Sequence, residues 1–119
     1  MVKKTKVMQI QTFINDWLAA SNDFNIRRYL EFYLPEAILT DPSVERTFNG
    51  QTGIKEYFHN YFITYRTHTK QLSLEIKSQD HVYLEVEFNG DFPEGKIKGS
   101  FHFIFKNNKI ASVKADLID

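Results

Sequence analysis

One acidic residue, Asp41, stands where a carboxylate could do chemistry. It comes just after the apolar residues 37–39, and Pro42 fixes the backbone that follows it. A carboxylate at the end of a buried strand can face a cavity and move protons as a general base. Aspartate is also a common turn-initiating residue and a poor strand residue. The spacing alone leaves both interpretations open and favours the turn.

The other residues of catalytic type form no recognisable motif. The four histidines share no ligand spacing with one another or with carboxylates, and the absence of cysteine excludes thiolate ligands and disulfides. The five glycines form neither a GxGxxG sequence nor a P-loop, and no serine lies in a nucleophile elbow. We therefore expect no metal ion and no cofactor.

The aromatic residues are unusually numerous, with 11 Phe and 6 Tyr in 119 residues. Tyr57, Tyr61 and Tyr65 recur every fourth residue, which places them on one stripe of a helix. For any single ring, core packing is the more common role. A buried tyrosine hydroxyl needs a partner, however, so several tyrosines on an inward stripe favour a cavity over a solid core.

Length and charge restrict the class of protein. A chain of 119 residues fits one domain, which we place at residues 1–119. The 15 basic residues balance the 15 acidic ones, so no basic field is present that would bind nucleic acid or an anionic membrane. No apolar run approaches the roughly 18 residues of a membrane span. The expected location is the cytoplasm.

The hydrophobic periodicity predicts three helices followed by four strands. A period of 3.6 indicates helices over about residues 5–23, from residue 26 up to Pro35 with Tyr33 on its apolar stripe, and from Gly50 to Tyr65. Short extended segments are expected at 37–40 and 44–48. From residue 68 the period is 2, and a tight turn is expected at Asn107-Asn108. Helices gathered on one side of an antiparallel sheet define the α+β class.

This order of elements, with three local motifs, resembles the NTF2-like superfamily and within it the SnoaL-like and ketosteroid-isomerase-like domains. The motifs are Trp17-Leu18-Ala19-Ala20, Asp41-Pro42 and Gly50-x-x-x-Ile54-x-x-Tyr57-Phe58, and the likeness extends from about residue 7 to 118. The resemblance implies a cone-shaped, curved antiparallel sheet wrapped around three N-terminal helices, as in cystatin-like rolls. It also implies a deep apolar pocket and a homodimer formed through the outer face of the sheet.

The resemblance further implies that Asp41 is the general base, because ketosteroid isomerases use the aspartate of an Asp-Pro pair. Their oxyanion donors would fall on Trp17 and Phe101, and a supporting tyrosine would fall on Phe58. Phenylalanine donates no hydrogen bond, so efficient steroid isomerisation is not expected. The residues expected to line a ligand are Trp17, Tyr33, Tyr57, Phe58, Tyr61, Phe101, Phe103 and Val113.

Two functions remain open on the sequence. The first is binding of a small, largely apolar molecule in the cone, with cofactor-free isomerase, cyclase or dehydratase chemistry at Asp41. The second is a non-catalytic module for dimerisation or partner binding, whose cone is filled by side chains. A cavity of a few hundred Å³ with Asp41 on its wall would favour the first function.

Overall fold

The computed structural model describes residues 9–118, and within them three α-helices cover a six-stranded sheet. The first half of the described chain contains α1 (Ile10–Asn22), α2 (Ile26–Glu31), β1 (Tyr33–Asp41), the short helix η2 (Pro42–Val44), β2 (Arg46–Asn49) and α3 (Gly50–Phe58). The second half contains the π-helical turn η3 (His59–Ile63) and the strands β3 (His68–Ser78), β4 (His81–Asn89), β5 (Lys96–Lys106) and β6 (Lys109–Ile118). The part of the first helix expected before residue 9 lies outside the described residues.

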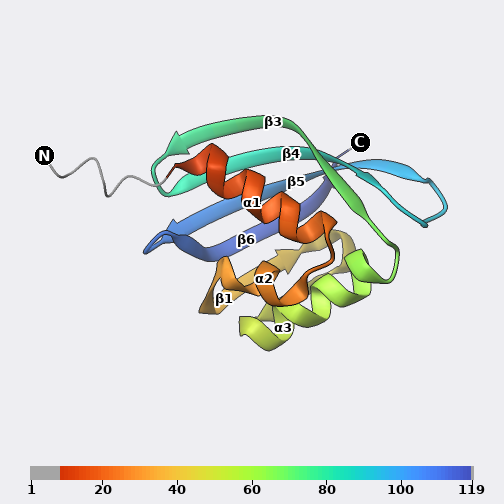
Figure 1. Cartoon of the computed structure of the whole chain (residues 1–119), viewed down its shortest axis with the longest axis horizontal. Helices are drawn as coiled ribbons and strands as arrows, with labels where there is room; N and C mark the ends of the chain where they lie inside the picture. Colours follow the sequence, from red (N-terminus) through yellow and green to blue (C-terminus); the bar gives the residue numbers. More distant parts are fainter. Residues whose placement is uncertain (1–8, 119) are drawn as a thin grey trace, which may run out of the picture.

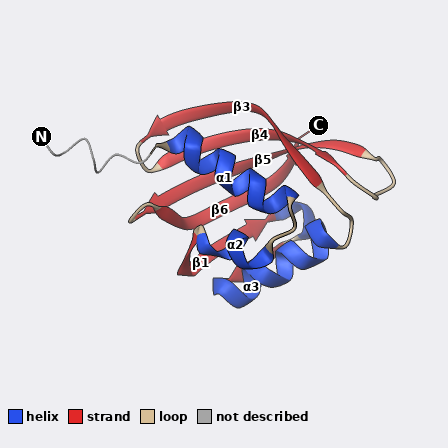
Figure 2. Ribbon diagram, viewed as in Figure 1, coloured by secondary structure: helices blue, strands red, loops and turns tan. Residues whose placement is uncertain are grey.

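The strands lie in the order β2-β1-β6-β5-β4-β3. All neighbours pair antiparallel except β1 and β6, which run parallel although they come from opposite ends of the chain. The helices lie together on one face of the curved sheet (Figures 1 and 2). This arrangement confirms the predicted α+β class and the roll of a curved sheet around helices.

The interior of the roll between α1 and β5 is filled by aromatic side chains. Trp17 on α1 packs edge-on against Phe101 and Phe103 of β5, with ring centroids 4.9 and 5.2 Å apart. Its indole N–H donates to the Tyr33 hydroxyl at 3.1 Å, and that hydroxyl donates to Tyr29 at 2.7 Å. Every polar atom of this buried chain therefore has a partner inside the protein.

The second helix is shorter than the sequence predicts. In the structure it ends at Glu31, and Tyr33 is the first residue of β1. The backbone N–H of Ile110 donates to the Phe32 carbonyl at 2.9 Å, and Tyr33 pairs with Ile110 in parallel register. Pairing with a distant strand thus overrides the local helical pattern. Pro35 is accommodated because the pairing of β1 with β6 is interrupted between residues 33 and 38.

The third helix also differs from the prediction. It is α-helical to Phe58 and then widens into η3, where the Thr64 N–H donates to the His59 carbonyl at 3.0 Å. Tyr65 lies beyond this turn rather than within a continuous α-helix. A π-turn adds a residue to the helical repeat, so it changes which side chains face inward.

Candidate functional site

The carboxylate of Asp41 is buried at the end of β1, with only 6% of the residue exposed. Its Oδ1 accepts hydrogen bonds from the backbone N–H of Ser43, at 2.9 Å, and from the Ser43 hydroxyl. These contacts cap the short helix η2. Asp41 therefore starts a turn, as its sequence context favours, while its second oxygen remains available for other contacts.

The second oxygen of Asp41 faces α3. Tyr57 donates its hydroxyl to Oδ2 at 2.8 Å, and both side chains are buried. Burial, followed by the charge of Asp41 and this hydrogen bond, raises the pKa of Tyr57 well above its usual value. Tyr57 therefore remains a protonated donor at neutral pH. The result is a carboxylate held by three donors from two elements.

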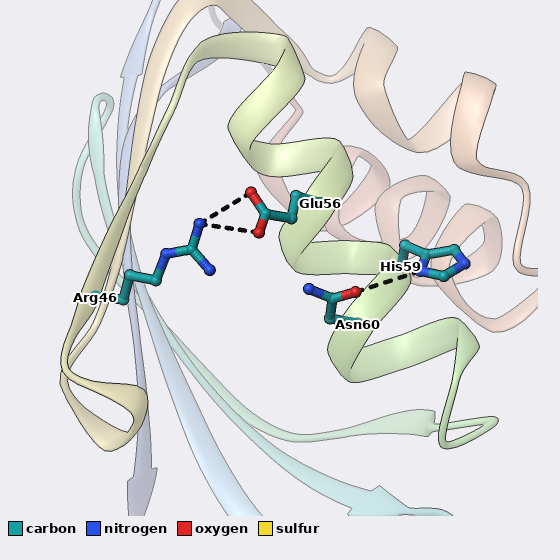
Figure 3. A network of polar contacts seen from close by, with 4 residues as sticks. All are labelled: Arg46, Glu56, His59 and Asn60. Atoms are coloured by element: carbon teal, nitrogen blue, oxygen red, sulfur yellow. Dashed lines mark hydrogen bonds and ion pairs between the residues drawn. The ribbon is translucent and has the colours of Figure 1, made fainter.

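An ion pair on the outside of the fold connects β2 to α3. Nη2 of Arg46, on β2, contacts both carboxylate oxygens of Glu56 at 3.0 and 2.9 Å (Figure 3). The guanidinium also lies 4.5 Å from the ring centroid of Phe48. Both charged side chains are about half exposed, so we assign the pair no more than about 1 kcal/mol. It links β2 to the helix residue beside Tyr57.

A cavity of about 250 Å³ opens beside this carboxylate. It lies between η2, the end of α3 with η3, and the turn that joins β4 to β5. Its wall is formed by Asp41, Ser43, Val44, Tyr57, Tyr61, Phe62, Tyr65, Thr67, Phe88, Phe92, Glu94, Ile97 and Leu117. The volume lies just below the roughly 300–1,000 Å³ of pockets for drug-sized ligands, so the cavity suits a small molecule.

The cavity brings together three of the residues that the sequence assigns to a site, namely Asp41, Tyr57 and Tyr61. The others are not part of its wall. Trp17, Tyr33, Phe58, Phe101 and Phe103 are packed in the filled interior of the roll, and Val113 lies beneath a groove on the opposite face of the sheet. A ligand in this cavity would therefore contact η2, the end of α3 with η3, and the β4–β5 turn.

Several wall residues were not assigned to a site from the sequence. Phe92 and Glu94 belong to the β4–β5 turn, where Pro and Gly indicate a turn but not its direction. Phe88 and Leu117 follow the alternating pattern of ordinary core strands. Tyr65 is the exception, since the stripe of tyrosines on the third helix had already indicated a cavity.

The described residues give no support for a metal site or a membrane-spanning helix. Within residues 9–118, no three His, Asp or Glu side chains come together in a way that could hold a metal ion. No helix in the same range is long and apolar enough to span a membrane.

The described residues form a small α+β roll with an acidic group on the wall of a cavity. The family model of the SnoaL-like domain matches residues 14–113, so the chain belongs to the SnoaL-like domain family. No curated protein matches the sequence.

Solved structures share the fold at low sequence identity. A candidate polyketide cyclase from Sinorhizobium meliloti is 16% identical, with a TM-score of 0.79 over 87% of this chain and 93% of that one. An NTF2-like protein of unknown function from Burkholderia xenovorans is 12% identical, with a TM-score of 0.79 over 100% and 88%. A protein with a ketosteroid isomerase-like fold from Catenulispora acidiphila, in complex with trimethylamine, is 15% identical, with a TM-score of 0.76 over 87% and 82%.

Proposed function

We propose that the protein binds a small, largely apolar molecule in the cavity beside Asp41, and that Asp41 acts on it as a general base. The observation that carries the proposal is the position of Asp41, a buried carboxylate on the wall of a 250 Å³ cavity that is otherwise mainly apolar and aromatic. Pockets of this kind bind small ligands through apolar contacts and orient them through a few polar groups.

The proposed chemistry needs no cofactor. Asp41 would accept a proton from a carbon next to a carbonyl, as expected for an isomerase, cyclase or dehydratase. Tyr57 holds the carboxylate in one orientation through its hydrogen bond to Oδ2. Similarity to a candidate polyketide cyclase and to a ketosteroid isomerase-like fold supports this class of reaction without identifying the substrate.

The Trp17 side chain supplies no oxyanion donor in this site. Its only N–H is committed to the Tyr33 hydroxyl, and the ring lies in the filled part of the roll. Phe101, at the second oxyanion position of the isomerases, is not part of the cavity wall and packs behind the wall residue Phe88, with ring centroids 5.9 Å apart. We therefore do not propose steroid isomerisation.

The test is hydrogen–deuterium exchange of small ketones in D₂O. The exchange is monitored through the loss of their α-proton signals in NMR spectra. The panel should include neutral ketones and ketones that carry an amine. We expect the protein to accelerate exchange for members that fit the cavity, and Asp41→Asn to lower that acceleration by about 100-fold or more. Equal rates with the wild type and Asp41→Asn would show that Asp41 is not the base.

A second candidate function has its own support. The interior of the roll around Trp17 is filled, and Asp41 caps η2, as expected for a non-catalytic module that dimerises. Ile38 and Ile104 are more than 40% exposed around a groove on the outer face of the sheet, near the adjacent rings of His81 and His102. Light scattering after size exclusion would detect a homodimer, and Ile104→Lys should make it monomeric if this face is the interface.

A further inference from the structure

The cavity wall carries negative charge without a matching cation. Asp41 lies deep in the wall and Glu94 lies at its exposed rim. Among the wall residues of the described chain, none is Lys, Arg or His. Two arginines adjacent to this region are already paired, Arg46 with Glu56 at 2.9 Å and Arg66 with Asp91 at 3.1 Å. No cationic side chain of the wall therefore balances this charge.

The charge of Asp41 is held in place rather than neutralised. Ser43 contributes two donors to Oδ1, and Tyr57 contributes one to Oδ2. These three donors are neutral, so they orient the carboxylate without supplying a positive charge. A buried anion with donors but no counter-charge is a suitable partner for a ligand cation.

Aromatic rings form most of the rest of the wall. Tyr57 and Tyr61 lie with ring centroids 5.3 Å apart and planes inclined at 45°, and Tyr65 and Phe92 lie 6.2 Å apart at 59°. Phe62 and Phe88 complete the set. These rings are inclined to one another, so they do not form a single flat wall. Ring faces attract cations, and groups of aromatic rings are a known means of binding alkylated ammonium ions.

We propose that the natural ligand of the cavity is a small organic cation, an amine that carries alkyl groups. Its ammonium group lies near Asp41 and its alkyl groups contact the tyrosine and phenylalanine rings. Glu94 at the rim attracts the cation from solution. This inference rests on the proposed function because it uses the same cavity. It adds the chemical class of the ligand.

The test compares choline with 3,3-dimethylbutan-1-ol, which has the same shape but carbon in place of the charged nitrogen. Binding is followed from the shifts of backbone amide signals in ¹H–¹⁵N spectra during titration. We expect choline to shift the amides of the cavity wall and to bind at least about tenfold more tightly than the alcohol. The difference should shrink as salt is added, because the rim charge is exposed.

Three variants distinguish the contributions of Asp41, Glu94 and overall net charge to choline binding. Asp41→Asn should abolish most of the preference for choline, and Glu94→Gln should reduce choline affinity about threefold while leaving the alcohol unchanged. Glu94 is exposed, so its replacement tests the proposal even if Asp41→Asn folds poorly. Glu36→Gln, an exposed substitution on β1 outside the cavity wall, is the control for net charge and should have no effect.

The outcomes distinguish this inference from the proposed function. Equal or tighter binding of the neutral alcohol would overturn the cation proposal and leave an apolar ligand site in place. A failure of both probes to shift the amides of the wall would overturn both. If Glu36→Gln weakens choline as much as Glu94→Gln, or if Asp41→Asn retains the full preference, the cation is not recognised by this wall and the inference is wrong.

Discussion

Replacing Tyr57 by Phe tests whether the hydrogen bond to Asp41 supports the site. The substitution removes one hydroxyl and keeps the ring, which contacts Phe48, Tyr61 and Phe62. No void is created, so the cost comes from the lost bond to a charged acceptor at 2.8 Å. Such bonds contribute about 1.5–3 kcal/mol to stability. The cavity lets water reach the freed oxygen, so we expect a loss near 2 kcal/mol, toward the lower half of this range.

The assay is urea unfolding of the wild type, Tyr57→Phe, Asp41→Asn and the double variant. With a denaturant slope of about 2 kcal/mol per molar urea, Tyr57→Phe should lower the midpoint by about 1 M. Asparagine keeps an acceptor for the Ser43 N–H but lacks the charge that faces Tyr57. The double-mutant cycle should therefore give a coupling energy of about 1 kcal/mol or more between positions 41 and 57.

The reasoning would be refuted by a coupling energy below about 0.5 kcal/mol, the size expected for residues that do not interact. A change in the denaturant slope rather than in the midpoint would also count against it, because it would indicate a change in the folded or unfolded ensemble rather than the loss of one bond.

Two further predictions concern the buried tyrosines and the cavity wall. Burial is the largest cause of the raised pKa values of Tyr29, Tyr33 and Tyr57, so their contribution to stability is complete below an unfolded-state pKa of about 10 and is lost as pH rises toward the folded-state values. Urea unfolding should show stability falling above pH 10 by up to about 1.4 kcal/mol per pH unit for each tyrosine, and constant stability between pH 9 and 11 would contradict this. At Gly99, a Cβ atom would collide with the ring of Phe88, so Gly99→Ala should cost about 1–3 kcal/mol by urea unfolding and weaken binding of any probe that fits the cavity. Wild-type stability in that variant would show that the ring moves aside freely.

The local sequence patterns correctly predicted the elements whose structure depends mainly on residues close together in the sequence. The apolar stripe of α1 is buried as its period requires, with Ile14 and Trp17 almost fully covered. The expected turn between the last two strands forms at Asn107 and Asn108, which adopt φ values of 53° and 63°. Asparagine tolerates this left-handed region, so the residue type alone was sufficient to predict the turn.

Features that depend on distant pairing could not be read from local sequence. Tyr33 fits a helical stripe with Tyr29 and Leu30, but its partner in the structure is Ile110. The place of the cavity depends on where the β4–β5 turn brings Phe92 and Glu94, which no spacing in the sequence specifies. The role of Asp41 as both a turn cap and a cavity residue needed the register of β1 against β2 and the position of α3.

The parallel pair of β1 and β6 has a consequence for how the molecule folds. The strands β3, β4, β5 and β6 pair with their neighbours in sequence, but β1 is joined to them through its pairing with β6, which is remote in sequence. Contacts between remote segments are slow to form because a long loop must close first. Asp41 is the last residue of β1, so we expect the carboxylate to reach its place in the sheet only when this remote pairing forms. A substitution that destabilises β6 should therefore unfold the region around Asp41 before β3, β4 and β5 separate.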